Sequence, residues 1–364
     1  MSSAYGVYIH IPFCKAKCKY CAFVSVSDFS LQHAYVDTLI KEIRSAPEKG
    51  STVDTIYIGG GTPSCLYGGA LLDIINAVRE MFSVDPCAEI TVECNPESVN
   101  ERFVNECIEC GVNRVSIGLQ SADDRVLNAI GRVHTKEKFI RAIELISSRF
   151  DNISSDLILG LPHQTEKDII NSIDIFAKYC THASVYALTV EEGTPLFKDG
   201  YATDDDRIAD LYDLARNRLS LYGFERYEVS NFAKPNKQSK HNGKYWLCEP
   251  YLGFGVAAHG YDGGTRRYGH TDRITDYISA PERRYVSLTP DDLYNEYVML
   301  RLRTERGINL KDFLSRFCYD FIEKNKSAVD RLINDKACLV QEGRFFIAPN
   351  YMFVMNGIIE ELMV

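Results

Sequence analysis

Cys14, Cys18 and Cys21 have the residue type and the spacing to hold an iron–sulfur cluster. They stand in the run His10-Ile-Pro-Phe-Cys-Lys-Ala-Lys-Cys-Lys-Tyr-Cys-Ala-Phe23. A [4Fe–4S] cluster usually takes one cysteine for each of its four irons. Because this loop supplies only three thiols, one iron is left for an outside ligand. An open iron beside bound S-adenosylmethionine is a way to start radical chemistry.

Zinc is the main alternative for these thiols, besides three cysteines without a metal. Structural zinc sites favour paired C-x₂₋₄-C units and four protein ligands, and no second pair follows nearby. The other nine of the 12 cysteines are scattered, as small core residues or surface thiols are. We therefore favour the open cluster.

Length and charge exclude several classes of protein. The 364 residues suffice for one large domain and a smaller one. A net charge of −9 argues against general nucleic-acid binding. Arg266, Arg267 and Arg273 could still form a local basic patch, although most such runs are ordinary solvated surface charges. Neither a signal peptide nor a membrane-spanning run is evident, so we expect a cytoplasmic protein whose cysteines stay reduced.

Short β-rich runs alternate with helical periodicity through the first 220 residues or so. The expected strands are Tyr5–Ile11, Val53–Ile58, Glu89–Cys94, Arg114–Leu119, Ser155–Leu159 and Ala183–Thr189. The expected helices include Ser30–Ala46, Leu71–Phe82, Glu101–Cys110, Thr135–Ser148 and Glu166–Tyr179. Such alternation predicts an α/β fold with a parallel sheet, here an open partial (β/α)₆ TIM-type barrel. Active sites of such sheets lie at the carboxyl ends of the strands, where the cysteine loop begins.

Three divisions of the chain are expected. Residues 1–223 form the partial barrel, residues 224–289 a Gly-, Tyr- and Asn-rich segment that covers it, and residues 290–364 a small helical, winged-helix-like domain. In the last division the expected elements are helices near Asp291–Arg303, Leu310–Phe317 and Ala328–Lys336, and strands Leu339–Val340 and Phe345–Ala348. No basic recognition helix is evident, so DNA binding does not follow.

Polar or glycine-rich residues end several of the expected strands. Gly59-Gly-Gly-Thr62 is either a tight turn or a site where a ligand approaches the backbone, and it lacks the Gly-Lys-Ser/Thr of a P-loop. Glu93, Gln120 and Asp156 stand in successive strands; each alone could cap a helix, but together they are expected to converge on one crevice. There Glu93 would take an ammonium, Asp156 ribose hydroxyls and Arg132 a carboxylate, although a lone arginine is more often a surface charge.

An aromatic constellation, Lys240-His-Asn-Gly-Lys-Tyr-Trp246, contains the single tryptophan of the chain. Histidine is a common axial ligand of heme iron, and flat aromatic walls suit a macrocycle. From the residues alone, however, a structural aromatic cluster with a hydrogen-bonded His241 is the better interpretation. His259 is likewise interpreted as structural.

Six motifs in this order resemble one family. They are Tyr-Ile-His-Ile-Pro-Phe-Cys-x₃-Cys-x₂-Cys, Gly-Gly-Gly-Thr-Pro, Glu-Cys-Asn-Pro, Ser-Ile-Gly-Leu-Gln-Ser, Asp-Leu-Ile-Leu-Gly-Leu-Pro and His-Asn-x₂-Tyr-Trp. Over nearly its whole length the chain resembles the radical S-adenosylmethionine (SAM) proteins of the oxygen-independent coproporphyrinogen III oxidase-like group, most closely the HemW-type heme chaperones.

The resemblance implies three cofactors and their residues. Cys14, Cys18 and Cys21 would hold a [4Fe–4S] cluster, with SAM on the fourth iron. Residues expected at SAM, some of them at a second SAM molecule, are Tyr8, Tyr20, Gly60, Gly61, Thr62, Glu93, Gln120, Arg132, Asp156 and Ala187. Residues expected at heme are His241, Asn242, Tyr245 and Trp246.

Two functions from different classes follow from the resemblance. The first is a heme carrier with an unknown acceptor protein, a reductant such as flavodoxin or ferredoxin, and peripheral membrane contact only through the acceptor. The second is an enzyme, an oxygen-independent coproporphyrinogen III oxidase or another radical enzyme acting on a tetrapyrrole. The oxidase needs a further cysteine two residues after its third cluster ligand, where this chain has Phe23, so a carrier is favoured. Either a monomer or a homodimer is compatible with the sequence.

Overall fold

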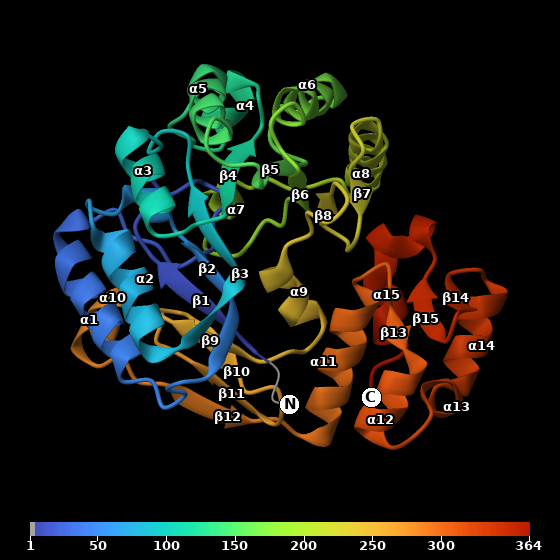
Figure 1. Ribbon diagram of the computed structural model, residues 1–364. Coiled ribbons are helices and arrows are strands. Elements are labelled where there is room, and N and C mark those ends of the chain that lie inside the picture. The colour runs from blue at the N-terminus through green and yellow to red at the C-terminus, as the bar shows by residue number, and fades with distance from the viewer. Residues whose placement is uncertain (1–3) are drawn as a thin grey trace.

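A curved sheet dominates the computed structural model, which describes residues 4–364 (Figure 1). Within these residues twelve strands form one sheet in the order β12-β11-β10-β9-β1-β2-β3-β4-β5-β6-β8-β7. Six parallel strands form its centre: β1 (Tyr5–Ile11), β2 (Thr52–Gly60), β3 (Ser83–Cys94), β4 (Arg114–Gln120), β5 (Ile153–Leu159) and β6 (His182–Ala187). The predicted six parallel strands and the open partial barrel are confirmed.

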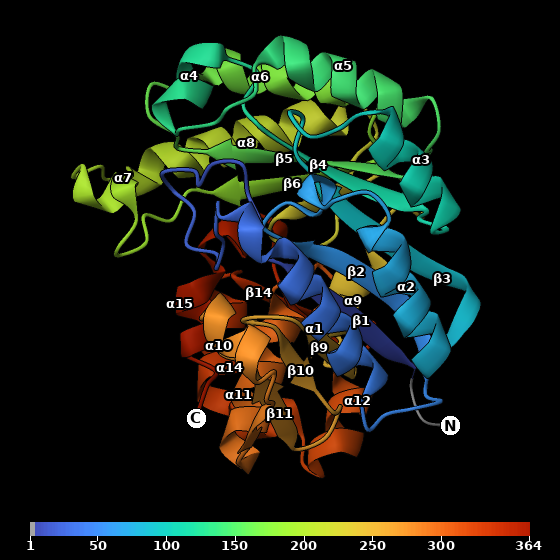
Figure 2. The ribbon, with the colours of Figure 1, turned by 90° about the vertical axis from the view of Figure 1, so that its left-hand side faces the viewer.

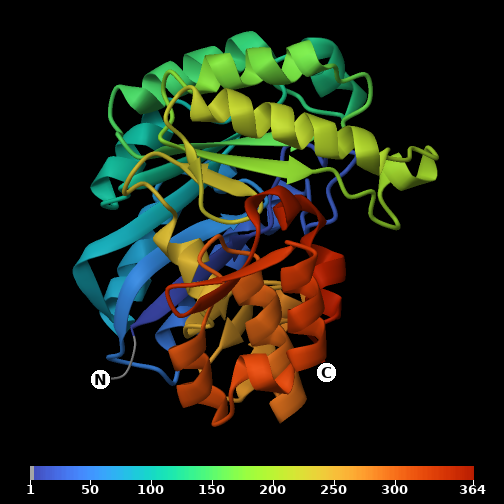
Figure 3. The ribbon, with the colours of Figure 1, turned by 90° about the vertical axis from the view of Figure 1, so that its right-hand side faces the viewer.

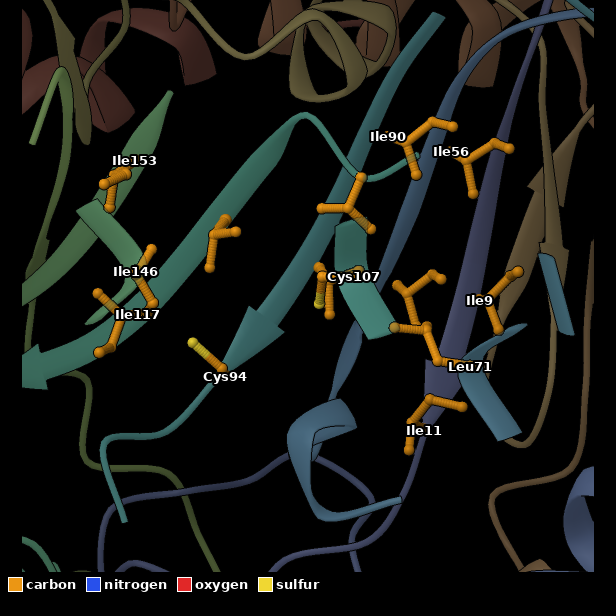
Figure 4. Packing of buried hydrophobic residues seen from close by; sticks show 14 of the residues in the cluster. Ile9, Ile11, Ile56, Leu71, Ile90, Cys94, Cys107, Ile117, Ile146 and Ile153 are labelled. Carbon is orange, nitrogen blue, oxygen red and sulfur yellow. The ribbon is translucent and has the colours of Figure 1, made fainter. Parts of the chain in front are cut away.

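Helices cover the convex face of this sheet, as Figure 2 shows. They are α1 (Gln32–Arg44), α2 (Ala70–Met81), α3 (Glu101–Glu109), α4 (Asp124–Ala129), α5 (Lys136–Ser147), α6 (Glu166–Phe176) and α8 (Asp205–Ser220), and the short α7 (Pro195–Lys198) projects beyond the barrel. The Asn100, Thr135 and Thr165 side chains accept backbone N–H groups at the starts of α3, α5 and α6. Outward-facing strand residues such as Ile9, Ile56 and Ile117 form the core beneath these helices (Figure 4).

The concave face of the parallel strands is polar, in contrast to the apolar interior of a closed barrel. Because successive strand residues point to opposite faces, every second side chain enters the concavity. These residues include Thr55, Tyr57, Glu89, Thr91, Glu93, Arg114, Ser116, Ser154, Asp156, His182 and Ser184. Such an interior suits hydrogen bonding rather than apolar packing.

Residues 225–287 extend the sheet at both edges and thus do more than cover the barrel. They form β7 (Glu225–Arg226), β8 (Asn231–Ala233), α9 (Lys240–Trp246), β9 (Tyr251–Phe254), β10 (His259–Tyr261), β11 (Arg266–Gly269), α10 (Ile274–Ser279) and β12 (Arg284–Ser287). Strand β9 pairs in parallel with β1, and β8 pairs antiparallel with β6. Strands β1 and β6 therefore do not close on each other, and α9 lies in the concavity (Figure 1).

The arginines of this segment form ion pairs. Arg266 pairs with Asp262, Arg267 with Glu296 and Arg273 with Asp276. Their charge is locally balanced, so the alternative of a basic patch loses its support.

Residues 290–364 form a smaller unit below the barrel, shown in orange and red in Figure 3. It consists of α11 (Pro290–Leu302), β13 (Ile308–Asn309), α12 (Leu310–Phe317), α13 (Phe321–Lys324), α14 (Lys326–Asn334), β14 (Cys338–Gln341), β15 (Arg344–Ile347) and α15 (Met355–Glu360). The expected helices and hairpin are present, and β13 adds a third strand beside β15. Most of its buried apolar side chains form a core separate from that of the barrel. Along residues 4–364 no helix combines the length and apolar character needed to cross a membrane.

Candidate functional site

The cysteine loop lies at the carboxyl end of β1, beside a hollow of about 490 Å³. All three loop cysteines line this space, which we call the cysteine hollow. The loop is fixed at its base and in its middle, because the Cys14 N–H donates to the Val26 carbonyl at 3.0 Å and the Lys19 N–H donates to the Ile130 carbonyl at 2.9 Å. The backbone thus presents the thiols to one space.

The three thiols form a donor set that suits a cluster. All three line the same hollow. In a cubane cluster each thiolate bonds a different iron. The donor set therefore fits a [4Fe–4S] cluster with one iron left for another ligand.

The glycines at the carboxyl end of β2 pack against the start of the loop. Gly60 has a φ of +106°, and its N–H donates to Glu93 Oε2 at 3.0 Å. A Cβ on Gly61 would lie 2.7 Å from the backbone oxygen of Ile11. Gly60 and Gly61 also line the cysteine hollow. The glycine run is therefore both a tight turn and a surface that a ligand can approach.

Two carboxylates lie deep in the hollow. Glu93 accepts a hydrogen bond from the Tyr57 hydroxyl at 2.6 Å. Burial raises the pKa of Glu93 to about 7, with a contribution from Asp156 and opposing hydrogen bonds from Tyr57 and Gly60. Burial also raises the pKa of Asp156 to about 6. Both groups would gain from a positively charged or hydrogen-bonding ligand.

SAM binding is expected to weaken as the pH falls through about 7, because protonated Glu93 loses its attraction for the amino group of the methionine moiety. One pH unit below that pKa the ionised fraction, and with it the affinity, falls up to about tenfold. Equilibrium binding between pH 6 and 8 measures this slope. Glu93→Gln should bind more weakly at pH 8 and lose most of the slope, whereas the exposed Glu101→Gln keeps it. A slope unchanged in Glu93→Gln would remove Glu93 from the site.

A chain of polar contacts joins Arg132 to Cys14, the first cysteine of the loop. Arg132 Nη1 donates to Asn95 Oδ1 at 2.9 Å, and Asn95 Nδ2 donates to Thr62 Oγ1 at 2.8 Å. The Thr62 hydroxyl in turn donates to Cys14 Sγ at 3.4 Å. Burial opposes the charge of Arg132, but Tyr20 and other nearby acidic groups outweigh it and raise its pKa above the ordinary value. Arg132 therefore lies buried in the lining of the cysteine hollow and is not a surface charge.

Unsatisfied polar atoms indicate that the hollow suits a polar ligand. Gln120 Oε1 and Arg132 Nε are buried without a hydrogen-bond partner. Gln120 also has a φ of +60°, a backbone conformation that a non-glycine residue adopts at a cost and that clusters at functional sites. A bound SAM would offer a carboxylate, an amino group and ribose hydroxyls to these atoms.

The structure brings together most of the residues expected at SAM. Those that line the cysteine hollow are Tyr20, Gly60, Gly61, Glu93, Gln120, Arg132, Asp156 and Ala187. Tyr8 and Thr62 lie behind this lining, bonded to His10 and to Asn95. Asn95, Ser116 and Tyr186 also line it but were not predicted individually, although Asn95 belongs to the Glu-Cys-Asn-Pro motif.

His241 lies elsewhere, on α9 within the concavity, and it is 1% exposed. Its Nδ1 is 2.9 Å from Thr55 Oγ1 and its Nε2 is 2.9 Å from the Tyr245 hydroxyl. Burial, followed by the charges of Lys244 and Arg114, lowers its pKa to about 3, so the ring is neutral. Both ring nitrogens are engaged, and iron can bind only if one of these hydroxyls is displaced.

Helix α9 is tightly held in this position. The Lys240 and His241 N–H groups donate to the Glu89 carboxylate at 3.2 and 3.1 Å. The buried Lys244 ammonium lies 2.8 Å from Asp54 Oδ1. The negative charge of Glu89 lies at the N-terminus of α9, where the helix dipole favours an acid. Release of His241 therefore has to overcome several polar contacts.

The remaining residues expected at heme belong to the same helix. The Asn242 N–H donates to Ser239 Oγ at 3.3 Å. Tyr245 meets Tyr251 edge-on, and the Arg303 guanidinium lies 5.6 Å from the Trp246 ring. In the described part of the chain, none of His241, Asn242, Tyr245 and Trp246 lines the cysteine hollow. The two groups of predicted residues occupy separate places.

Comparison with known proteins places the chain in a family. The model of the Radical SAM superfamily matches residues 8–176. The heme chaperone HemW of Mycobacterium tuberculosis strain H37Rv is 36% identical over 84% of this chain and 83% of its own length. The chain belongs to the HemW family of radical SAM proteins. The HemW of Bacillus subtilis strain 168 is also 36% identical, over 86% of both chains, and that of Escherichia coli K12 is 38% identical over 70% of this chain and 69% of its own.

A solved structure supports the fold independently. Coproporphyrinogen III oxidase HemN from Escherichia coli superposes with a TM-score of 0.86, covering 100% of this chain and 91% of that chain, at 19% sequence identity. At that identity the likeness concerns the fold alone. It agrees with the α/β partial barrel and its mostly parallel sheet.

Proposed function

We propose that this protein is a cytoplasmic heme chaperone that binds heme and transfers it to an acceptor protein. The main support is the identity to HemW relatives of about one residue in three over more than four fifths of the chain. A [4Fe–4S] cluster on Cys14, Cys18 and Cys21 would carry an exchangeable SAM. The cluster, when bound, supplies an iron for SAM and one-electron chemistry.

The residues proposed for SAM and for heme lie in separate places, which favours transport of heme over a reaction on it. The residues proposed for SAM line the cysteine hollow, whereas His241 lies beneath them in the concavity. Tyr57 and Glu93 are packed between the two places, since Tyr57 stacks on His241 and bonds Glu93. A heme held by His241 would therefore be separated from the cofactor site by packed side chains. This arrangement suits a SAM molecule that regulates heme binding better than one that reacts with heme.

A hollow on the outer side of α9 offers a way toward His241. It has a volume of about 440 Å³ and is lined by Thr55, Lys240, Gly243 and Lys244 among others. Thr55 is also the partner of His241 Nδ1. We place the approach of heme here, with displacement of the Thr55 or Tyr245 hydroxyl from the ring.

The experiment is a titration of anaerobic, cluster-loaded protein with heme, followed by its Soret absorbance. We expect a shifted Soret band that is lost in His241→Ala without loss of the cluster, because the iron loses its imidazole ligand. His259→Ala is the matched control, since His259 is exposed. Tyr245→Phe frees Nε2 and should bind heme at least as tightly as the unaltered protein.

A coproporphyrinogen III oxidase is the competing function. The exposed Phe23, where that oxidase carries a further cysteine, lines the cysteine hollow and argues against it. Release of protoporphyrinogen from coproporphyrinogen III, with SAM and a flavodoxin or ferredoxin as reductant, would overturn the carrier proposal. Heme bound equally well by His241→Ala would remove His241 as its ligand.

A further inference from the structure

Tyr57 belongs to neither of the two predicted groups of residues, yet it contacts both. Its hydroxyl donates to Glu93 Oε1 at 2.6 Å. Its ring stacks on the His241 imidazole, with ring centroids 5.3 Å apart and an interplanar angle of 30°. We propose that Tyr57 is a positioning residue through which SAM at Glu93 and heme at His241 raise each other's affinity. The inference rests on the proposed function and adds a regulation to it.

The contacts of Tyr57 leave it little freedom to move alone. Gly59 makes room for them, since a Cβ there would lie 2.7 Å from Glu93 Cδ and 2.8 Å from Tyr57 Cε1. On the other side Tyr8 stacks on Tyr57 with centroids 6.2 Å apart. In a close-packed interior a rigid aromatic ring moves only when its neighbours move.

The same packing reaches the cysteine loop. The Tyr8 hydroxyl lies 3.0 Å from His10 Nδ1, and His10 Nε2 lies 3.0 Å from the carbonyl oxygen of Val24. Val24 follows Cys21 by three residues. Continuous contacts therefore run from the cysteine loop through His10, Tyr8 and Tyr57 to His241.

Both ligands require a change at Tyr57. Heme iron can bind His241 only if the Thr55 or Tyr245 hydroxyl is displaced from the imidazole, and an imidazole that turns toward iron has to move against Tyr57, which is stacked on it. The amino group of SAM would compete with the Tyr57 hydroxyl for Glu93 Oε1. The first ligand to bind bears the cost of breaking the Tyr57–Glu93 bond, and the second does not. The coupling is therefore positive, and linkage makes it the same in both directions.

The test compares heme affinity with and without saturating SAM in cluster-loaded protein. We expect SAM to tighten heme binding roughly tenfold, within the usual range of coupling between sites. Tyr57→Phe keeps the ring and removes only the hydroxyl, so both ligands should still bind. The coupling factor, which is the ratio of heme affinities with and without SAM, should fall to about one. Tyr179→Phe is the control, because Tyr179 donates to Glu144 at 3.2 Å on the surface and lies outside this path. A purely structural role of Tyr57 would change affinities without abolishing the factor.

Amide hydrogen exchange of residues 240–246 provides a readout without heme. In the unaltered protein SAM should speed exchange in α9, and in Tyr57→Phe it should not. An equal coupling factor in both proteins, or a factor of one in the unaltered protein, overturns the inference while leaving the carrier intact. If the unaltered protein binds no heme, the proposed function fails, and the exchange measurement still decides whether Tyr57 transmits SAM binding to α9.

Discussion

Protein carrying Cys18→Ser, purified without oxygen, is expected to be colourless. Three thiols hold the proposed cluster, so the loss of one leaves two anchors for four irons. The expected result is loss of the brown absorbance and of nearly all bound iron. Visible absorbance and iron per chain measure both.

Cys65→Ser is the control that tests the number of ligands. Burial raises the pKa of Cys65 to about 11, and the nearby Cys14 thiol contributes to this rise, but Cys65 does not line the cysteine hollow. This variant should keep the cluster and its SAM-dependent spectrum. Loss of the cluster in Cys65→Ser would reveal a fourth protein ligand, and an intact cluster in Cys18→Ser would contradict the ligand assignment.

The second large effect is expected for Gly60→Ala. A Cβ at this position would lie 2.5 Å from the His10 ring, which is held by Tyr8 and Val24. The φ of +106° adds strain for any residue with a Cβ. Together the strain and the clash should lower the free energy of unfolding by about 3 kcal/mol. SAM affinity should fall as well, since the Gly60 N–H supports Glu93.

Gly69→Ala separates the two causes. Gly69 has a similar φ of +91°, but nothing lies within 4 Å of a Cβ built on it. Gly69→Ala should lower the free energy of unfolding by about 1 kcal/mol, through backbone strain alone, and leave SAM binding unchanged. Denaturant unfolding and equilibrium SAM binding of both variants measure the difference. Equal destabilisation by the two substitutions would show that the His10 contact is unimportant.

The parallel half of the sheet was predictable from the sequence because its strands alternate with amphipathic helices. The bounds of β1 were predicted to the residue, and β4 extends one residue beyond the prediction. Strands β7 to β12 escaped prediction because they contain only two to four residues each, too few for a periodicity. The pairing of β9 with β1 joins segments about 245 residues apart, which no local pattern reveals.

Sequence motifs predicted which residues belong to the candidate site, but not which of them contact one another. The three cysteines, Glu93 and Asp156 were predicted from their motifs and meet at one hollow. Tyr57 was missed because a tyrosine inside a strand looks like a core residue until its partners are known. The engagement of both His241 nitrogens also depends on Thr55 in a distant strand. Such contacts are properties of the packed fold.

The position of β1 in the middle of the sheet has a consequence for biosynthesis. Its neighbours are β2, which follows within 60 residues, and β9, which ends at Phe254. A nascent chain emerging from the ribosome would thus expose one unpaired edge of β1 until most of the polypeptide has been translated. Unpaired edges invite aggregation, so this strand is a natural target for protection during synthesis.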